Sequence, residues 1–268
     1  KGISLLKKGN LNHRKKALLH NKKKVLMIET ISKKLAPTGI LRVGINMSNF
    51  LLINGKDLNG LPDGVSPDIG KKLARELNLK CKLVQFKKPG LLADAVNEDM
   101  WDIGNIACEN ERSKTIDFTD PYVNIDANFM FRKKDNFKTN DDINLTGIKI
   151  AVLERSAYDL WLTENFKNVE LIRVNTIEES HQLFREDEVN VLAGLKPKLI
   201  EEIKTNDDFQ MINSPFTYIK QSIGIKKGAP EILDFLNKFI SKLIKEGYVE
   251  SLLKKHNVQN KLSIPNIY

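Results

Sequence analysis

The sequence contains few of the residues that build disulfide-stabilised or metal-stabilised proteins. Its 268 residues include two cysteines and four histidines. Cys81 and Cys108 are too few and too far apart for a disulfide framework or a metal site, and the histidines show no metal-ligand spacing. A single bond between the two cysteines would need an oxidising compartment, whereas their positions in apolar runs favour buried free thiols. We therefore expect no metal ion.

Long apolar runs and cofactor-binding loops are also missing. No apolar run approaches the roughly 20 residues that span a bilayer, so we expect a chain that is not embedded in a membrane. The sequence has no glycine-rich phosphate-binding loop and no nucleophile elbow, which argues against nucleotide and hydrolase chemistry and predicts no cofactor. Lys22, Lys23 and Lys24 precede the apolar residues 25–28, but Glu29 ends that run. A secretion signal needs about 7–15 apolar residues, so this run of four is too short to be a clear one.

Negative charge is almost absent from the first 34 residues. This segment holds 11 lysine and arginine residues against one acid, Glu29, and the remaining chain holds 32 basic and 33 acidic residues. The net charge is therefore +10 for the segment and −1 for the rest. Such a tail suits contact with phosphate, nucleic acid or an anionic membrane surface, although a solvated, partly helical leader is the plainer interpretation. Because the chain lacks stacked aromatics and any recognised nucleic-acid module, we expect no nucleic-acid partner.

The body of the chain alternates strand and helix patterns. Hydrophobic residues make up 41% and charged residues 29% of the chain, as in ordinary soluble globular proteins. In the first half, strand patterns at 40–45, 81–86 and 101–107 alternate with helix patterns that begin at Pro67 and Pro89. This order is typical of a parallel sheet covered on both faces.

The same order restarts after residues 124–140, which join two α/β units. Further strand patterns and helix patterns follow to the end of the chain. Strands are predicted at 147–153, 169–174, 189–193 and 222–225, and helices at 156–165, 177–184, 197–203, 230–246 and 249–256. The sequence thus predicts two α/β units followed by one more strand and two helices.

The segment from Trp101 to Tyr122 is the most informative part of the chain. A short apolar strand leads into a polar, helix-starting stretch that carries Arg112, and then into the strand-like residues 117–119. An arginine at the end of a strand, beside free backbone N–H groups, suits a two-point grip on a carboxylate. A surface arginine that pairs with Glu109 or Glu111 is the alternative.

The order and spacing of these segments resemble the extracellular solute-binding proteins of polar amino-acid ABC transporters, family 3. The similarity covers residues 38–258, and its pieces are weak singly but specific in their order. The matching pieces are Leu41-Arg42-Val43-Gly44, Gly64-Val65-Ser66-Pro67-Asp68, Trp101-Asp102-Ile103-Gly104, Glu111-Arg112-Ser113-Lys114, Asp117-Phe118-Thr119, Pro121-Tyr122, Lys149-Ile150-Ala151-Val152-Leu153 and Ile223-Gly224-Ile225-Lys226-Lys227-Gly228. The resemblance implies an α/β, two-lobed periplasmic-binding-protein-like fold of type II (Venus flytrap), with a parallel-dominated sheet in each lobe and a two-strand hinge.

The resemblance also implies a division of the chain and a function. Residues 1–37 would be a basic N-terminal extension, 38–127 plus 221–258 a discontinuous lobe 1, 128–220 lobe 2, and 259–268 a C-terminal tail. The cleft between the lobes would capture a small carboxylated solute, an amino acid or a related organic anion, by hinge closure. A monomeric, periplasmic, non-enzymatic protein would then deliver it to the membrane permease of an ABC importer. A cytoplasmic location stays open.

Five lobe 1 residues are implied as ligand contacts. By the resemblance, Arg112 grips the ligand carboxylate, and Asn105 and Ala107 lie where the family supplies polar and backbone contacts. An amide that satisfies local backbone is the alternative for Asn105. Asn49 and Phe50 are nearest to the family's ligand-covering aromatic, although Phe50 as core packing is an equal alternative.

Four lobe 2 residues complete the implied site. The strand-to-helix turn with Arg155, Ser156 and Ala157 matches the family's second ligand-facing loop, where helix-initial N–H groups hold an anion. Ser156 also suits an N-cap, and the two roles are compatible. Amino-acid binders commonly carry an aspartate for the ligand ammonium after the strand that corresponds to residues 189–193, but this chain has Lys196 there and no acid. A more anionic ligand therefore becomes plausible, unless Glu154 replaces the missing acid.

Two further function classes stay open. Enzymes of the cyclohexadienyl dehydratase type resemble these binding proteins, and such an activity would need a general acid in the cleft. Glu154 is the candidate, although a solvated glutamate is the plainer interpretation. The other class is a ligand-sensing domain of a receptor.

Overall fold

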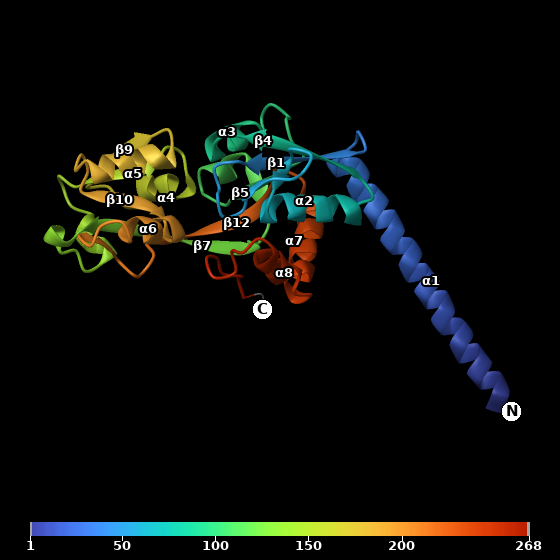
Figure 1. Cartoon of the computed structure of the whole chain (residues 1–268). Coiled ribbons are helices and arrows are strands. Elements are labelled where there is room, and N and C mark those ends of the chain that lie inside the picture. The colour runs from blue at the N-terminus through green and yellow to red at the C-terminus, as the bar shows by residue number, and fades with distance from the viewer. Residues whose placement is uncertain (1, 267–268) are drawn as a thin grey trace.

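The computed structural model describes the backbone of residues 2–266 and the side chains of residues 16–266. Figure 1 shows two lobes side by side and a long N-terminal helix, α1 (Gly2–Leu35), that projects from one of them. We call the lobe that carries α1 lobe 1 and the other lobe 2. Strands β7 (Val123–Arg132) and β12 (Thr217–Lys226) run from one lobe into the other.

Lobe 1 is a mainly parallel sheet covered by helices. Its elements are β1 (Ile40–Asn46), β2 (Gly55–Lys56), β3 (Pro62–Asp63), α2 (Val65–Glu76), β4 (Lys80–Phe86), α3 (Pro89–Asp94), β5 (Ile103–Ala107), η1 (Arg112–Lys114), β6 (Ile116–Phe118), α7 (Pro230–Lys245) and α8 (Tyr248–Lys255). Strand β1 pairs in parallel with β4 on one side and β5 on the other. The predicted strands of this unit are confirmed to within a few residues.

Alternation along β1 sends neighbouring side chains to opposite faces of the lobe 1 sheet. Val43 packs against Gly70 of α2, and a Cβ on that glycine would lie 2.6 Å from the valine. Gly44 lies under Leu92 of α3 and under Trp101, and a Cβ on it would lie 2.5 Å from Leu92. The two helices therefore cover the two faces, and close packing fixes these glycines.

Lobe 2 repeats the arrangement. Its elements are η2 (Lys133–Asp135), η3 (Asn140–Ile143), β8 (Lys149–Leu153), α4 (Ala157–Asn165), β9 (Glu170–Val174), α5 (Ile177–Arg185), β10 (Val191–Leu195), α6 (Lys196–Ile203) and β11 (Phe209–Met211). Strand β8 pairs in parallel with both β9 and β10. The sequence analysis missed β11, which is three residues long and pairs with the end of β7.

The two crossing strands join the sheets of the lobes. Residues 221–224 of β12 pair with β5 in lobe 1, and residues 217–221 pair with β7. Residues 127–131 of β7 pair with β10 in lobe 2. All these pairings are antiparallel. Together with the parallel pairings inside each lobe, they give one sheet with the strand order β4-β1-β5-β12-β7-β10-β8-β9. No strand bounds were predicted for β7, whose residues were taken as part of the joining segment 124–140, and β12 extends beyond the predicted strand 222–225 toward lobe 2, where its residues alternate between buried and exposed.

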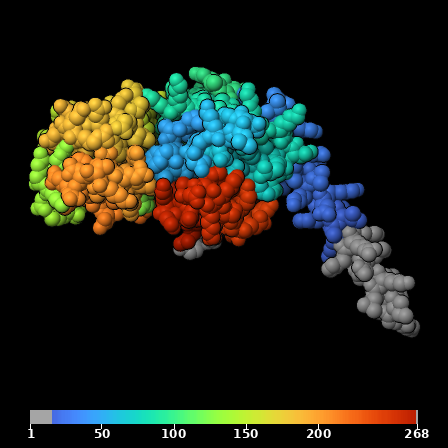
Figure 2. Space-filling model, viewed as in Figure 1, coloured from blue at the N-terminus to red at the C-terminus, as the bar shows by residue number. Residues whose placement is uncertain are grey.

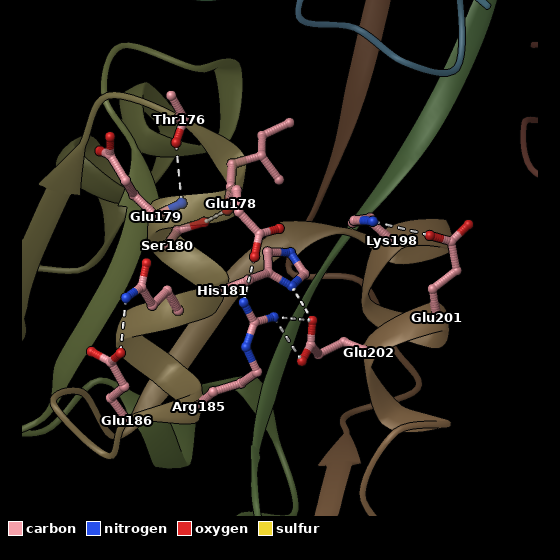
Figure 3. A network of polar contacts seen from close by, with 12 residues as sticks. Thr176, Glu178, Glu179, Ser180, His181, Arg185, Glu186, Lys198, Glu201 and Glu202 are labelled. Atoms are coloured by element: carbon pink, nitrogen blue, oxygen red, sulfur yellow. Dashed lines mark hydrogen bonds and ion pairs between the residues drawn. The ribbon is translucent and has the colours of Figure 1, made fainter.

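A buried polar network ties α5 to α6 inside lobe 2 (Figure 3). His181 Nδ1 and Glu202 Oε2 lie 2.7 Å apart, and Arg185 Nη1 donates to both oxygens of Glu202. Arg185 also pairs with Glu178. Burial lowers the pKa of His181, so the ring is neutral at pH 7. These side chains stabilise lobe 2, and none of them lines the cleft between the lobes.

Two predictions about the first part of the chain need correction. The basic leader is one continuous helix of 34 residues rather than a partly helical segment. Its C-terminal end packs on lobe 1, where Ile31 and Leu35 are buried. Both cysteines are free, but Cys81 is exposed and Cys108 is half-buried, so the expected burial was wrong. Cys81 lies on β4, which is the edge strand of the sheet.

Candidate ligand-binding site

A small cavity lies between the two lobes. Its volume is about 50 Å³, far below the roughly 300–1,000 Å³ of typical small-molecule sites. It is lined by Asn46, Ser48, Asn49, Pro89, Ile106, Ala107, Arg112, Leu153, Ser156, Ala157, Tyr158, Ile177, Leu195, Ile219 and Gln221. Many of these residues stand at the carboxyl ends of β1, β5, β8 and β10, where parallel sheets present their binding groups. The lobes are thus closed on each other, and a solute the size of an amino acid needs them to separate.

Arg112 is the one charged residue in this lining, and it is 5% exposed. Its Nη1 donates to the carbonyl of Ala107 in lobe 1 at 2.9 Å, and its Nη2 donates to the carbonyl of Arg155 in lobe 2 at 3.0 Å. Burial lowers the pKa of Arg112 to about 10, partly opposed by the charge of Glu109. The surface arginine considered above is therefore wrong, and Glu111 pairs with Lys114 instead.

Glu109 lies half-buried beside Arg112 at the junction of the lobes. Burial raises the pKa of Glu109 to about 7, the nearby arginine lowers it in part, and Glu164 of lobe 2 adds to the rise. Glu109 is thus a group that changes charge near neutral pH. Sequence reasoning treated it only as a salt-bridge partner, because nothing in the local pattern indicates burial.

Arg155 fastens the rim of the closed cleft. Its Nη1 and Nη2 donate to the two carboxylate oxygens of Asp94 in lobe 1, each at 2.7 Å. Gly90 lies directly against it, and a Cβ there would be 3.0 Å from Arg155 Cζ. The side chain is directed to this ion pair, and its backbone carbonyl meets Arg112. Two further hydrogen bonds join the lobes at the rim, from Asn110 Nδ2 to Glu164 at 2.9 Å and from Lys88 Nζ to Asn175 at 2.7 Å.

The mouth of α4 forms the lobe 2 wall of the cavity. Ser156 is its N-cap, and its hydroxyl accepts a hydrogen bond from the N–H of Asp159 at 3.1 Å. The N–H groups of Ala157 and Tyr158 belong to the first helical turn, which has no carbonyl partners inside the helix. A helix start of this kind attracts negative charge. The predicted turn therefore faces Arg112 across the cavity.

Among the other predicted residues, Ala107 and Asn49 line the cavity. The Oδ1 of Asn49 accepts the N–H groups of Leu51 and Leu52, so its amide nitrogen is the group left for a ligand. Asn46 and Ser48, which sequence reasoning missed, also line it, and Asn46 Oδ1 accepts from the Ser48 hydroxyl at 2.7 Å. Their position directly after the first strand was the available signal.

Four predicted contacts lie outside the lining, namely Arg155 at the rim and three others. Asn105 accepts a hydrogen bond from the Tyr122 hydroxyl at 3.0 Å, inside lobe 1. Phe50 packs against the lobe 1 core. Lys196 pairs with Asp126 at 3.2 Å. Like Arg155, these residues have other structural roles in the closed arrangement, and their roles as ligand contacts stay predictions.

The lining contains no aspartate or glutamate. Glu154, the residue considered as a substitute counter-charge and as a general acid, is exposed. Missed polar groups of the lining are Gln221, which is buried on β12, and the phenol of Tyr158. No sequence motif surrounds Gln221, because its place depends on how the crossing strands pair. The cavity therefore combines one guanidinium with neutral hydrogen-bonding groups.

One group of possible metal ligands lies away from the cleft. Asp63, Asp68 and His256 place ligand atoms within 4.8 Å of one another. Lys255 Nζ and His256 Nε2 already contact the same oxygen of Asp68, at 2.7 and 2.8 Å. The Asp68 carboxylate is therefore already paired with an ammonium, and these contacts tie α8 to α2.

The comparison with known families agrees with this architecture. The profile of the bacterial extracellular solute-binding proteins, family 3, matches residues 41–259. The chain belongs to this family. The two lobes, the crossing strands and the cavity between them are what the resemblance implied, and the predicted fold is confirmed. None of the helices in the described part of the chain is apolar over a length that would cross a bilayer.

Individual relatives are distant. The L-cystine-binding protein TcyJ of Escherichia coli (strain K12) is 24% identical over 232 residues, covering 85% of this chain and 86% of the relative. The L-arginine-binding protein of Pseudomonas aeruginosa is 24% identical over 235 residues, covering 81% and 87%. A solved ancestral amino acid-binding protein, described as a precursor of cyclohexadienyl dehydratase, has a TM-score of 0.67 and 25% identity, covering 84% and 98%.

Proposed function

We propose that this family member captures a small carboxylated solute, an amino acid or a related organic anion, between its lobes. It then passes the solute to the membrane permease of an ABC importer, acting outside the cytoplasmic membrane as a monomer. The observation that carries this proposal is the burial of Arg112 in the cleft, where it hydrogen-bonds only to two carbonyls and forms no salt bridge with an acidic side chain of the described residues.

The energetics of Arg112 favour an anionic guest. A buried charge without a counter-charge costs several kcal/mol, and the lowered pKa of Arg112 reflects that cost. Its two hydrogen bonds go to neutral carbonyls, of Ala107 and Arg155. A carboxylate would replace these acceptors with a charged one in two-point geometry. The N–H groups at the start of α4 would contact the same anion from lobe 2.

The lining also restricts the rest of the solute. Because it has no carboxylate, an ammonium group would rely on neutral acceptors such as Asn46, Ser48 and Gln221. A second positive charge, as in lysine or arginine, would lie near Arg112 with no counter-charge. We therefore propose a solute with a neutral or acidic side chain, in contrast to the relative named for L-arginine.

The residue bounds of the lobes belong to the same proposal. We place lobe 1 at residues 38–127 plus 221–258 and lobe 2 at 128–220. The pairings of β7 and β12 support these bounds, because both strands change partners near residues 127 and 221. Opening would then bend the two strands and break the rim contacts of Asp94 and Arg155.

An enzyme of the dehydratase type is the second candidate, supported by the ancestral structure. It requires a carboxyl group that reaches the solute. The described lining supplies none, and Glu154 is exposed. Binding without chemistry is thus the better supported function.

A thermal-shift screen tests the proposal. Neutral and acidic amino acids, cystine, dicarboxylates, arginine and a polyamine are compared, because a ligand in excess raises the melting temperature by mass action. We expect a carboxylated, non-cationic compound to give the largest rise, and prephenate and arogenate to be left unchanged in an absorbance assay. A rise with the polyamine alone would contradict the charge assignment of the cleft, and turnover would favour the enzyme.

A further inference from the structure

Helix α1 combines exposed apolar side chains with many lysines, and the proposed solute binding explains neither. The described residues include thirteen exposed large apolar side chains, and five of them lie on one ten-residue stretch of α1. These five are Leu18, Leu19, Val25, Leu26 and Met27, each 49–64% exposed. The other eight are scattered over the two lobes. Figure 2 shows that the described part of α1 adjoins lobe 1 at one end and projects outward from it, and the lobes leave these side chains about half or more exposed.

The exposed apolar side chains form rows along the helix. Residues seven positions apart lie two turns apart on nearly the same side, so Leu18 and Val25 form one row and Leu19 and Leu26 the next. Ile31 and Leu35 face lobe 1 and are buried. Because each residue advances by about 100°, Leu19 and Leu26 are well separated in angle from Ile31 and Leu35, although Leu26 also borders the groove between α1 and α7. Their exposure is therefore not a consequence of docking α1 on lobe 1.

Positive charge lies between and beside these rows. Residues 16–34 contain six lysines and one acid, Glu29, and the whole segment 1–34 has a net charge of +10. Lysine side chains can lie along apolar surface while their ammonium groups reach anions. Apolar side chains interleaved with lysines fit one kind of partner well, a surface with negative head groups above an apolar layer.

A groove beside α1 carries the same combination of apolar side chains and lysines onto lobe 1. Its volume is about 700 Å³, and it runs between α1 and α7. Leu26, Met27 and Phe235 contribute apolar lining, and Lys23 and Lys238 lie among its charged residues. The groove and the helix rows thus form one continuous surface on the outside of the molecule, remote from the ligand cavity.

We propose that α1 binds the surface of an anionic phospholipid bilayer. The lysines would meet the lipid head groups, and the rows of Leu18, Leu19, Val25 and Leu26 would enter the boundary with the acyl chains. Nucleic acid would match the charge but leave these apolar side chains in water. The helix would hold the two lobes beside the membrane without crossing it.

Vesicle flotation with the full chain tests this proposal. Vesicles of neutral phosphatidylcholine are compared with vesicles that contain phosphatidylglycerol, at low and high salt. We expect binding only to the anionic vesicles, weakened by salt. Replacing Lys22, Lys23 and Lys24 together by alanine is expected to lower the binding constant by roughly 100-fold, because each lysine near such a surface contributes roughly fivefold.

A matched pair of double variants isolates the apolar rows. L19E/L26E changes two exposed residues of α1, and L58E/L145E makes the same change of charge at Leu58 and Leu145, exposed on lobes 1 and 2. We expect the first pair to lower vesicle binding at least tenfold and the second to change it less than twofold. Solute-induced thermal shifts should be equal in both, which separates this test from the proposed function and confirms folding.

Three results would overturn the proposal. They are equal binding to neutral vesicles, no binding to anionic vesicles at low salt, and equal loss in the two double variants. Release of the protein from vesicles by duplex DNA, with DNA binding unchanged in L19E/L26E, would assign the helix to nucleic acid instead.

Discussion

The molecule has two cationic regions that treat charge in opposite ways. In the cleft, one guanidinium is buried, makes two hydrogen bonds to carbonyls and forms no salt bridge with an acidic side chain of the described residues. On α1, lysines stand in water on a projecting helix. A desolvated charge is costly to leave unpaired, whereas solvated charges are screened. In the proposed functions, the single buried charge of Arg112 selects a carboxylated solute, whereas the many exposed charges of α1 attract an anionic membrane surface.

Removal of the buried charge should have the largest effect. We expect R112M to weaken binding of the solute by more than about 100-fold, because truncating one partner of a buried charge pair costs roughly 2–5 kcal/mol. The free protein should lose little stability, since an apolar side chain of similar length replaces a buried charge that has no salt bridge, which offsets the loss of two hydrogen bonds to carbonyls. Isothermal titration and thermal unfolding measure the two quantities.

Arg75 on α2 is exposed and provides the control. R75M should leave solute affinity and melting temperature almost unchanged. If R112M binds the solute as tightly as the parent protein, the assignment of Arg112 as the carboxylate anchor is wrong.

The protonation of Glu109, beside Arg112, should make the stability of the protein depend on pH. The pKa of its carboxyl group is about 7 in the folded protein, above the ordinary unfolded value of about 4.3. The folded state therefore binds more protons, so this contribution to stability is complete below the unfolded pKa and is lost as pH rises through about 7. We expect the melting temperature to fall between about pH 5 and pH 8, and E109Q to reduce the fall by roughly 2–4 °C.

Glu98 on lobe 1 is exposed and serves as the matched site. E98Q should keep the pH profile of the parent protein. The same profile in E109Q would show that Glu109 is not the titrating group.

The rim ion pair should have the smallest effect. Arg155 and Asp94 are both about half exposed, and exposed pairs contribute about 0.2–1 kcal/mol. We expect D94A and R155A each to weaken solute binding by at most about fivefold, and the double variant to add little, because the pair acts as one unit. Solution scattering of the free variants should show more open lobes. If the losses of solute affinity in the two single variants add up in the double variant, Arg155 and Asp94 act independently and the prediction is wrong.

The sequence predicted the fold better than the details of the site. Period-two and helical patterns placed most elements, because each depends on neighbouring residues. No strand bounds were predicted for β7, and β12 was predicted only over residues 222–225, since the pairing partners of both strands lie far away in the chain. Arg112 stood out through its local motif.

Predicted contacts beyond that motif depended on long-range partners. Arg155 meets Asp94 and Lys196 meets Asp126, both about 60–70 positions away in the sequence. Asn105 is held by Tyr122 inside the lobe. No local pattern indicates which acid or hydroxyl such a side chain will reach, so only the folded structure separates cleft residues from rim and core residues.

A structure determined with the bound solute tests the central claim most directly. We expect the solute carboxylate within about 2.7–3.2 Å of the Arg112 guanidinium nitrogens, with the carbonyls of Ala107 and Arg155 no longer its only acceptors. A solute bound elsewhere, with Arg112 still joined only to those two carbonyls, would contradict the account.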